Sequence, residues 1–458
     1  MSRTLHLNVF IHGRGHHEAA WRHPRAGTAP LTDIGFYEQV AAIAERGRFD
    51  SVFFADHLAI GSEVRHAARG ALEPLTLLAA LSRATEHIGL IATASSTYTE
   101  PYNLARQFAS IDHISGGRAG WNIVTSWLKA TSANFGDSTQ LGHDERYDRA
   151  FEYLDVVTKL WDSWAEDAHV DDRASGTYAD TDRVRPIRHS GRYYRVAGAL
   201  NVPRSPQGRP LLVQAGSSDK GRQFAATYAE AVFTAHLEKA TAVEFSTDLK
   251  ARAAALGRDP GHVLVLPGLS PAIGSTEAEA AALWDELNAL TVPEVGLGHL
   301  SARFGGADLS HLSLDERLSP GDLPDPATVE GAQSRAELIH RLVASERPTL
   351  RALLHKLAGG RGHYITAGTP EQIADVIEDW FRSGAADGFN VMPPILPAVL
   401  TDFVEQVVPI LQRRGLFRRE YTESTLRGHY GLPRPENRFF PAGAAERPEA
   451  AEPQALSR

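Results

Sequence analysis

The chain contains no cysteine among its 458 residues. This absence excludes disulfide bonds, thiolate metal sites and catalysis by a thiol nucleophile. The first residues lack a signal-peptide apolar region, and no apolar run approaches the ~20 residues that span a bilayer. The net charge is only −9, and basic blocks do not exceed pairs such as Arg413-Arg414. We therefore expect a cytoplasmic protein with no membrane or nucleic-acid partner.

Short apolar runs, each the length of a strand, alternate with helix-like segments along the chain. There are eight: Leu5–Ile11, Ser51–Ala55, Ile88–Ser95, Gly120–Thr125, Pro210–Ala215, Ala231–Ala235, Val263–Leu269 and Gly388–Met392. Strands buried on both faces read as continuous apolar runs, and alternation with helices favours parallel pairing. The sequence therefore predicts a (β/α)8 TIM-type barrel with insertions, whose active site lies at the carboxyl ends of the strands.

Residues 1–432 are expected to form this barrel as one domain. Two long irregular segments, at about 165–209 and 291–358, are predicted insertions. Excursions of this length are more often lids or oligomer contacts than plain connectors, and the second is expected to be a lid or an insertion on the substrate side. Residues 433–458 are rich in Pro, Ala and Glu, and this composition predicts a disordered tail.

A loop of small residues, Gly216-Ser217-Ser218, lies between a predicted strand and a predicted helix. Free amides at a helix start, two hydroxyls, and nearby Lys220 and Arg222 favour phosphate binding by this loop. Alternatively, Ser217 or Ser218 only caps the helix. The residues alone leave both interpretations open, and the frequency of phosphate sites on barrels favours binding slightly.

Two other polar side chains lie at the ends of predicted strands. Asp56, followed by His57, is suited to acid–base work, metal binding or a hydrogen bond to a ligand, or it only forms a turn. Asn122 is placed to point into the barrel and to hydrogen-bond a heterocyclic ring, or it is a satisfied core residue.

His143 and Tyr147 lie four residues apart at the start of a strongly periodic helix. This spacing allows both side chains to reach one ligand. The periodicity is equally consistent with Tyr147 as a core residue.

Histidines gather after the first predicted strand, at positions 12, 16, 17 and 23. A metal site is not favoured, because no His-x-His pair lies on the strand. Histidines in a polar loop are more often solvated or directed at a substrate.

Long motifs in a fixed order carry a resemblance to a known family. They are Gly15-His16-His17, Trp21-Arg22-His23-Pro24, Phe53-Phe54-Ala55-Asp56, Ile91 to Asn103, Asp112 to Thr125, Asn134-Phe135-Gly136, His143-Asp144-Glu145-Arg146-Tyr147, Gln214-Ala215-Gly216-Ser217-Ser218 and Asp387-Gly388-Phe389-Asn390. From about residue 5 to residue 432, the sequence resembles the nitrilotriacetate monooxygenase component A family of bacterial luciferase-like monooxygenases.

The resemblance implies a two-component monooxygenase. A separate NAD(P)H:FMN reductase would supply reduced, dissociable FMN, which reacts with O2 and oxygenates a small organic substrate of the aminopolycarboxylate, organosulfur, alkane or heterocycle class. The same resemblance implies a homodimer or a homotetramer.

The resemblance also assigns residues to the flavin. The implied FMN contacts are Asp56, Thr93, His143, Tyr147 and Ser218, with Ser217 and Asn122 as additional candidates. The residues alone would not choose Thr93 over Ser95 or Thr97. His16 or His17 is expected to face the reactive flavin edge, where it would hydrogen-bond the peroxide or act on the substrate.

Three other functions remain open at this point. They are hydride transfer with a deazaflavin, hydrolysis by a metal-dependent barrel, and flavin binding without turnover. Arg14, Arg22 and Arg25 hint at an anionic substrate, although arginines in exposed loops are usually only solvated.

Overall fold

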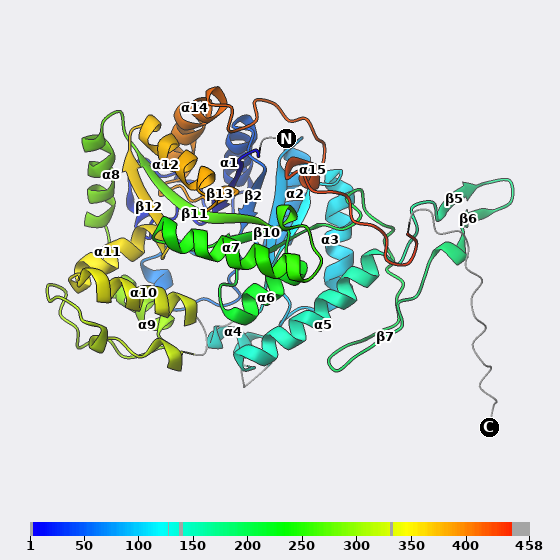
Figure 1. Ribbon diagram of the computed structural model, residues 1–458, viewed down its shortest axis with the longest axis horizontal. Helices are drawn as coiled ribbons and strands as arrows, with labels where there is room; N and C mark the ends of the chain where they lie inside the picture. The colour runs from blue at the N-terminus through cyan, green and yellow to red at the C-terminus, as the bar shows by residue number, and fades with distance from the viewer. Residues whose placement is uncertain (1–2, 127, 137–140, 330–332, 442–458) are drawn as a thin grey trace.

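The computed structural model describes residues 3–126, 128–136, 141–329 and 333–441. Its centre is a closed barrel of eight parallel strands. These strands are β1 (His6–Ile11), β2 (Ser51–Phe54), β3 (Gly89–Ser95), β4 (Ala119–Val124), β9 (Leu211–Gln214), β10 (Ala231–Thr234), β11 (Leu264–Ile273) and β13 (Gly388–Val391) (Figure 1). The ring closes because β10 pairs with both β9 and β11, and β13 pairs with both β1 and β11. Each predicted strand is present, so the barrel prediction is confirmed.

One further parallel strand was not predicted from the sequence. β12 (Tyr364–Gly368) pairs with β11 from Leu269 to Ile273, whereas β13 pairs with β11 at Gly268 and Leu269. β11 is ten residues long, so its second half extends beyond the ring and pairs outside it. The search for short apolar runs did not find β12, because most of the residues of this strand are only partly buried.

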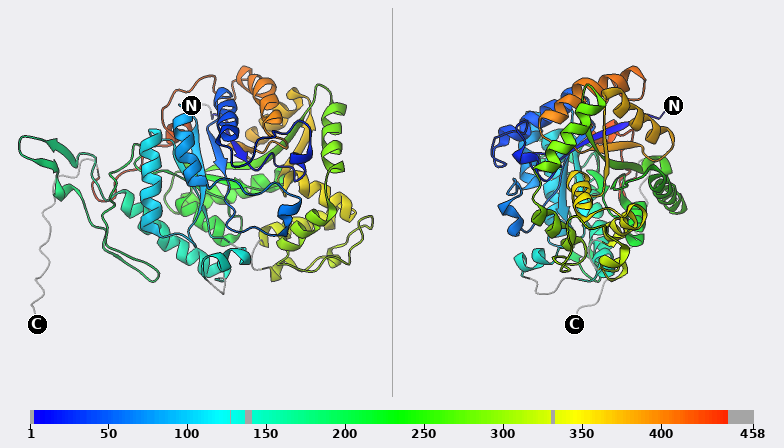
Figure 2. Two further views of the ribbon diagram at one scale, coloured as in Figure 1. Left: turned by 180° about the vertical axis from the view of Figure 1, so that it is seen from behind. Right: turned by 90° about the vertical axis from the view of Figure 1, so that its left-hand side faces the viewer.

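Helices surround the barrel as an outer layer (Figures 1 and 2). They are α1 (Ile34–Arg46), α2 (Pro74–Ala84), α3 (Pro101–Ser115), α5 (His143–Trp161), α6 (Asp219–Tyr228), α7 (Lys239–Ala255), α8 (Glu277–Ala289), α12 (Pro370–Arg382), α13 (Ala398–Asp402) and α14 (Val408–Arg413). α12 begins with a capping box, in which Thr369 and Gln372 exchange side-chain and backbone hydrogen bonds. No helix in the described ranges is both long and apolar enough to cross a bilayer.

The two irregular segments take different forms. The first carries two small hairpins, β5 (His169–Asp172) with β6 (Thr177–Ala179) and β7 (His189–Ser190) with β8 (Arg195–Val196), which project away from the barrel (Figure 2). The second contains three helices, α9 (Pro293–Arg303), α10 (Gln333–Glu346) and α11 (Leu350–Gly360). They share an apolar core that includes Leu300, Ile339 and Leu353. The three helices therefore form a small packed layer beside the barrel.

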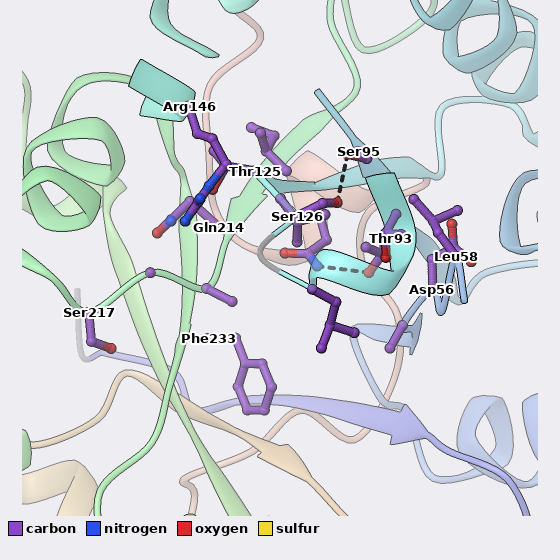
Figure 3. A pocket seen from close by; sticks show the side chains of 18 of the residues that line it. Asp56, Leu58, Thr93, Ser95, Thr125, Ser126, Arg146, Gln214, Ser217 and Phe233 are labelled. Atoms are coloured by element: carbon purple, nitrogen blue, oxygen red, sulfur yellow. Dashed lines mark hydrogen bonds between the residues drawn. The ribbon is translucent and has the colours of Figure 1, made fainter. Parts of the chain in front are cut away.

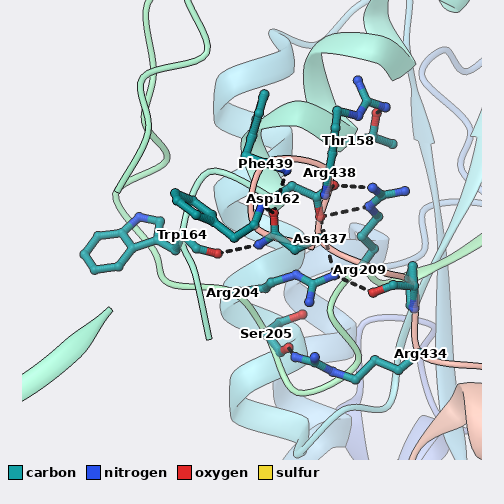
Figure 4. A network of polar contacts seen from close by, with 12 residues as sticks. Thr158, Asp162, Trp164, Arg204, Ser205, Arg209, Arg434, Asn437, Arg438 and Phe439 are labelled. Atoms are coloured by element: carbon teal, nitrogen blue, oxygen red, sulfur yellow. Dashed lines mark hydrogen bonds and ion pairs between the residues drawn. The ribbon is translucent and has the colours of Figure 1, made fainter. Parts of the chain in front are cut away.

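The segment from residue 433 to residue 441 is ordered, contrary to the predicted tail. Asn437 donates a hydrogen bond of 2.7 Å to the Trp164 carbonyl (Figure 4). Arg434 pairs with Glu166. The backbone N–H of Arg438 donates to buried Asp162. The composition argument was wrong here because these polar groups find partners on the barrel. Residues 442–458, also part of the predicted tail, lie outside the described residues.

Candidate active site

A cavity of about 410 Å³ opens at the carboxyl ends of β2, β3, β4 and β9. This volume is typical of a site for a small molecule or cofactor. The lining includes the seven residues that the sequence and the resemblance assigned to a cofactor: Asp56, Thr93, Asn122, His143, Tyr147, Ser217 and Ser218. Figure 3 labels Asp56, Thr93 and Ser217 among them. The fold thus brings together side chains that are up to 162 positions apart in the chain, from Asp56 to Ser218.

One wall of the cavity carries hydrogen-bond acceptors to which no described group donates. Asn122 and Thr93 are partners in the β3–β4 register, and the Asn122 amide donates to the Thr93 hydroxyl at 2.8 Å. The Asn122 oxygen is buried and has no hydrogen-bond partner among the described residues, and the Gln214 oxygen is in the same state. Buried acceptors are normally satisfied, so this wall is suited to a ligand that carries N–H groups.

Hydroxyl groups line the β9–α6 end of the cavity. Ser218 caps α6, because its hydroxyl accepts a 3.2 Å hydrogen bond from the Gly221 N–H, and it also lies 3.2 Å from Nε2 of His143. The hydroxyl of Ser217 lies 3.4 Å from that of Thr234. The capping interpretation is therefore correct for Ser218, and the same hydroxyl still lines the cavity. A capped helix start is compatible with an anion in this position.

Close packing explains the glycine in this loop. A Cβ atom on Gly216 would lie 2.3 Å from the amide nitrogen of Gln214 and 2.6 Å from the Tyr147 hydroxyl. Tyr147 is buried, and burial raises the pKa of its hydroxyl, so this group stays protonated. The loop, Tyr147 and Gln214 consequently form a small polar cradle.

The predicted cations of this loop are already paired. Lys220 pairs with Asp144 and Asp148, and Arg222 pairs with Asp248 at 3.0 Å. Their positive charge is therefore largely compensated by carboxylates. The hydroxyls and the helix start, rather than these two side chains, make the loop favourable for an anion.

Asp56 follows β2 and is partly buried in the cavity wall. Burial raises the pKa of this carboxyl to about 6, and a backbone hydrogen bond from His57 opposes the shift only in part. A carboxyl with such a pKa changes its charge near neutral pH and is suited to a hydrogen bond with a ligand.

The two histidines predicted to be catalytic do not line the cavity. Nε2 of His17 lies 3.3 Å from the Asn288 side-chain oxygen, Nδ1 accepts from the Ala19 N–H, and the ring lies beside Trp284. His17 is thus directed toward α8 and not toward the cavity. The prediction that His17 faces the reactive flavin edge is not supported, because the loop after β1 folds back against α8.

His16 lies directly behind the cavity wall. Its ring centroid is 4.4 Å from that of Phe10, which lines the cavity. Both ring nitrogens are buried and have no hydrogen-bond partner among the described residues. Burial holds the pKa of His16 well below its usual value, so the ring is neutral. No group of three or more His, Asp or Glu side chains in the described ranges is arranged to hold a metal ion.

Sequence reasoning missed several residues of the cavity. Phe10, Phe53 and Phe233 form an apolar wall with ring centroids 4.8 to 5.8 Å apart. Arg303 and Arg335, from α9 and α10, also line the cavity. The phenylalanines were visible as strand residues, but no spacing in the sequence placed the insertion arginines near the barrel mouth.

The arginines of the first loop serve structural contacts instead. Arg14 donates to the carbonyls of Thr28 and Ala29, and Arg25 pairs with Asp402 at 2.6 Å. Arg22 donates to the Leu290 carbonyl. The hint of an anionic substrate from these three residues is therefore not supported.

Comparison with known proteins decides the family. Residues 14–387 match the luciferase-like monooxygenases. The chain belongs to this family. This luciferase-like monooxygenase is 46% identical to N-acetyl-S-(2-succino)cysteine monooxygenase of Bacillus subtilis, over 95% of this chain and 98% of that protein. It is 45% identical to nitrilotriacetate monooxygenase component A of Aminobacter aminovorans, over 95% and 98% of the two chains.

A solved structure supports the same conclusion. Riboflavin lyase, crystallised with a modified FMN and riboflavin, has a TM-score of 0.83 with this luciferase-like monooxygenase. The two chains are 31% identical, with 94% of this chain and 96% of the other covered. The predicted family, fold and monooxygenase class are therefore confirmed.

Proposed function

We propose that this monooxygenase binds reduced FMN in the cavity at the barrel mouth and oxygenates a small organic substrate with O2. The observation that carries the proposal is the polarity of the cavity. Unsatisfied acceptors lie on one wall, and a hydroxyl-lined helix start lies at another end. A flavin mononucleotide has N–H groups on its ring and a phosphate at the end of its side chain, so its chemistry matches both.

The residues present fit the cofactor. The Gly216-Ser217-Ser218 loop, with His143 and Tyr147, would hold the phosphate. Asn122 and Gln214 would accept hydrogen bonds from the ring, and Thr93 would fix the Asn122 amide. Bound reduced flavin supplies the activation of dioxygen.

The chain itself binds, orients and excludes water. Phe10, Phe53 and Phe233 give the cavity a dry wall, and exclusion of water limits loss of the activated oxygen as hydrogen peroxide. Asp56 would hold or exchange a proton at the edge of the cavity, since its pKa of about 6 lies near neutral pH.

A separate NAD(P)H:FMN reductase is the proposed source of the reduced flavin. The nitrilotriacetate relative is by its name one component of a larger system, which supports a second component here. The named substrates of the relatives differ widely and include nitrilotriacetate, dibenzothiophene sulfone and long-chain alkanes. The family alone therefore does not fix the substrate of this chain.

We further propose a cytoplasmic homodimer or homotetramer. The projecting β5–β6 hairpin, with exposed Val170 and Tyr178, supports contact with a second copy of the chain. Light scattering after size-exclusion chromatography would test this proposal, and a monomer at micromolar concentration would contradict it.

Flavin titration tests the central proposal. We expect FMN to bind more tightly than riboflavin, because only FMN carries the phosphate. A generic FMN reductase with NADH should then support oxygen uptake that depends on an organic substrate. Absence of FMN binding in both redox states would overturn the proposal. Turnover with a reduced deazaflavin, without oxygen uptake with reduced FMN, would favour hydride transfer instead.

A further inference from the structure

Three arginines gather where the second insertion meets the barrel mouth. Arg303, at the end of α9, and Arg335, in α10, line the cavity together with Asp56 and Thr93. Arg361 caps α11 in a left-handed backbone conformation, with φ of 51°, that non-glycine residues rarely adopt. All three side chains are partly buried. The electrostatic influence of Arg303 reaches both Arg335 and Arg361, so the three charges form one cluster.

Neutral imidazoles, and not carboxylates, hold this cluster. Arg335 donates to Nε2 of His363 at 2.9 Å, and Arg361 donates to Nε2 of His12 at 2.9 Å. Burial holds the pKa of both histidines well below the usual value, so both rings are neutral acceptors. A neutral acceptor orients a guanidinium without cancelling its charge.

No described carboxylate pairs with the cluster. None of Arg303, Arg335 and Arg361 forms an ion pair within the described part of the chain, and one terminal nitrogen of Arg335 is buried without a partner. Glu18, which pairs with His299, acts on Arg361 only through its charge and forms no ion pair with it. The pKa of Asp56 is raised by burial and by the charge of Glu73, and the backbone hydrogen bond from His57 opposes this shift. The three arginines do not contribute to it.

Several other buried or partly buried arginines pair with carboxylates. Arg209 pairs with Asp162, Arg427 pairs with Glu230, and Arg222 pairs with Asp248. Proteins generally pair buried charges, because an uncompensated charge out of water is destabilising. Arg118 and Arg258 also lack an ion pair among the described residues, but each donates hydrogen bonds to several backbone carbonyls. Arg335 and Arg361 differ from both groups, because they donate to neutral imidazoles.

Burial does not remove their charge. The pKa of Arg335 and that of Arg361 are lowered to about 9, which still leaves both guanidinium groups protonated at pH 7. A neutral, apolar substrate would desolvate these cations further without supplying an anion. A carboxylate accepts two parallel hydrogen bonds from a guanidinium, which makes it a fitting partner.

We propose that the substrate of this enzyme is a small polyanion with at least two carboxylates, held by Arg303 and Arg335 with added attraction from Arg361. This inference rests on the proposed function, because it concerns the substrate of the same cavity. The phosphate of FMN is the other anion that could reach these arginines, and the experiment separates the two.

Calorimetric titration of the full-length protein, with and without bound FMN, tests the inference. The probes are nitrilotriacetate, without added divalent cations, and its neutral trimethyl ester. We expect the triacid to bind at least tenfold more tightly than the triester. Arg303→Leu and Arg335→Leu should each weaken triacid binding at least tenfold and leave triester binding unchanged, whereas Arg335→Lys should retain part of the affinity.

Arg351→Leu is the matched control, because Arg351 lies on α11 of the same insertion and pairs with exposed Asp315. It should bind the triacid as the wild type does. Equal affinity for triacid and triester would overturn the inference, as would leucine variants that weaken FMN binding but not riboflavin or triacid binding. Failure of the wild type to bind FMN would overturn the proposed function instead, and the triacid titration of flavin-free protein would still decide the charge of the substrate.

Discussion

The side-chain amide of Asn122 donates to the hydroxyl of Thr93 across adjacent strands of the barrel, at 2.8 Å. This contact fixes the amide, so its oxygen remains buried and without a hydrogen-bond donor from the described residues. The pair thus presents an oriented acceptor to the cavity, and substitution of either residue tests its role.

Asn122→Leu should weaken the binding of FMN and of riboflavin to a similar extent, because the amide contacts the ring that both share. The loss should be about fivefold, since one hydrogen bond contributes about 1 kcal/mol. Fluorescence titration measures both affinities. Thr93→Ser keeps the hydroxyl and is the control, which should bind as the wild type does. Unchanged riboflavin affinity in Asn122→Leu would contradict the assignment.

Ser218→Ala should weaken FMN binding and spare riboflavin, because its hydroxyl lies at the proposed phosphate end. The variant also loses the N-cap of α6, which should reduce the free energy of unfolding by about 1 kcal/mol. Thr369→Ala removes the N-cap of α12, away from the cavity, and controls for this effect. Similar FMN affinities in the two variants would show that Ser218 acts only as a cap.

Asp56→Asn should stabilise the flavin-free protein, and more so at higher pH. The folded-state pKa of about 6 exceeds the ordinary 3.8, so ionisation disfavours the folded state. This penalty is absent below pH 4, grows between pH 4 and pH 6, and is complete above pH 6, where it reaches at most about 3 kcal/mol.

Urea unfolding at pH 4.5 and pH 7.5 measures this effect. The gain in the free energy of unfolding from Asp56→Asn should be larger at pH 7.5. Asp285→Asn, at an exposed position on α8, is the control and should change stability little at either pH. An equal gain from Asp56→Asn at both values would contradict the raised pKa.

His16→Asn should increase the release of hydrogen peroxide relative to substrate oxygenation, because the His16 ring supports Phe10 in the cavity wall. His17→Asn should leave this ratio unchanged, since the His17 side chain contacts Asn288 and Trp284 instead. Oxygen uptake, peroxide and product are measured together. An unchanged ratio in both variants would remove both histidines from the reaction, and a change only in His17→Asn would contradict the placement of its ring.

The capping box at Thr369 and Gln372 and the strands of the barrel could be predicted from the sequence, because local hydrogen bonding and uninterrupted apolar runs leave few alternatives. β12 could not, since its partial exposure resembles that of a loop. The ordering of residues 433–441 was also hidden, because composition does not reveal that Asn437 and Arg434 find partners on distant segments.

The sequence by itself determined the order of strands and helices, the family motifs, and the types of side chain at the ends of the strands. Tertiary structure alone decided which of these side chains share a cavity, that His17 lies against α8, and that Arg303 and Arg335 reach the barrel mouth. The physical reason is the distance along the chain over which each interaction acts. Backbone preferences and apolar periodicity act over a few neighbouring residues, whereas the charge and hydrogen bonding of the cavity depend on groups that only folding brings together.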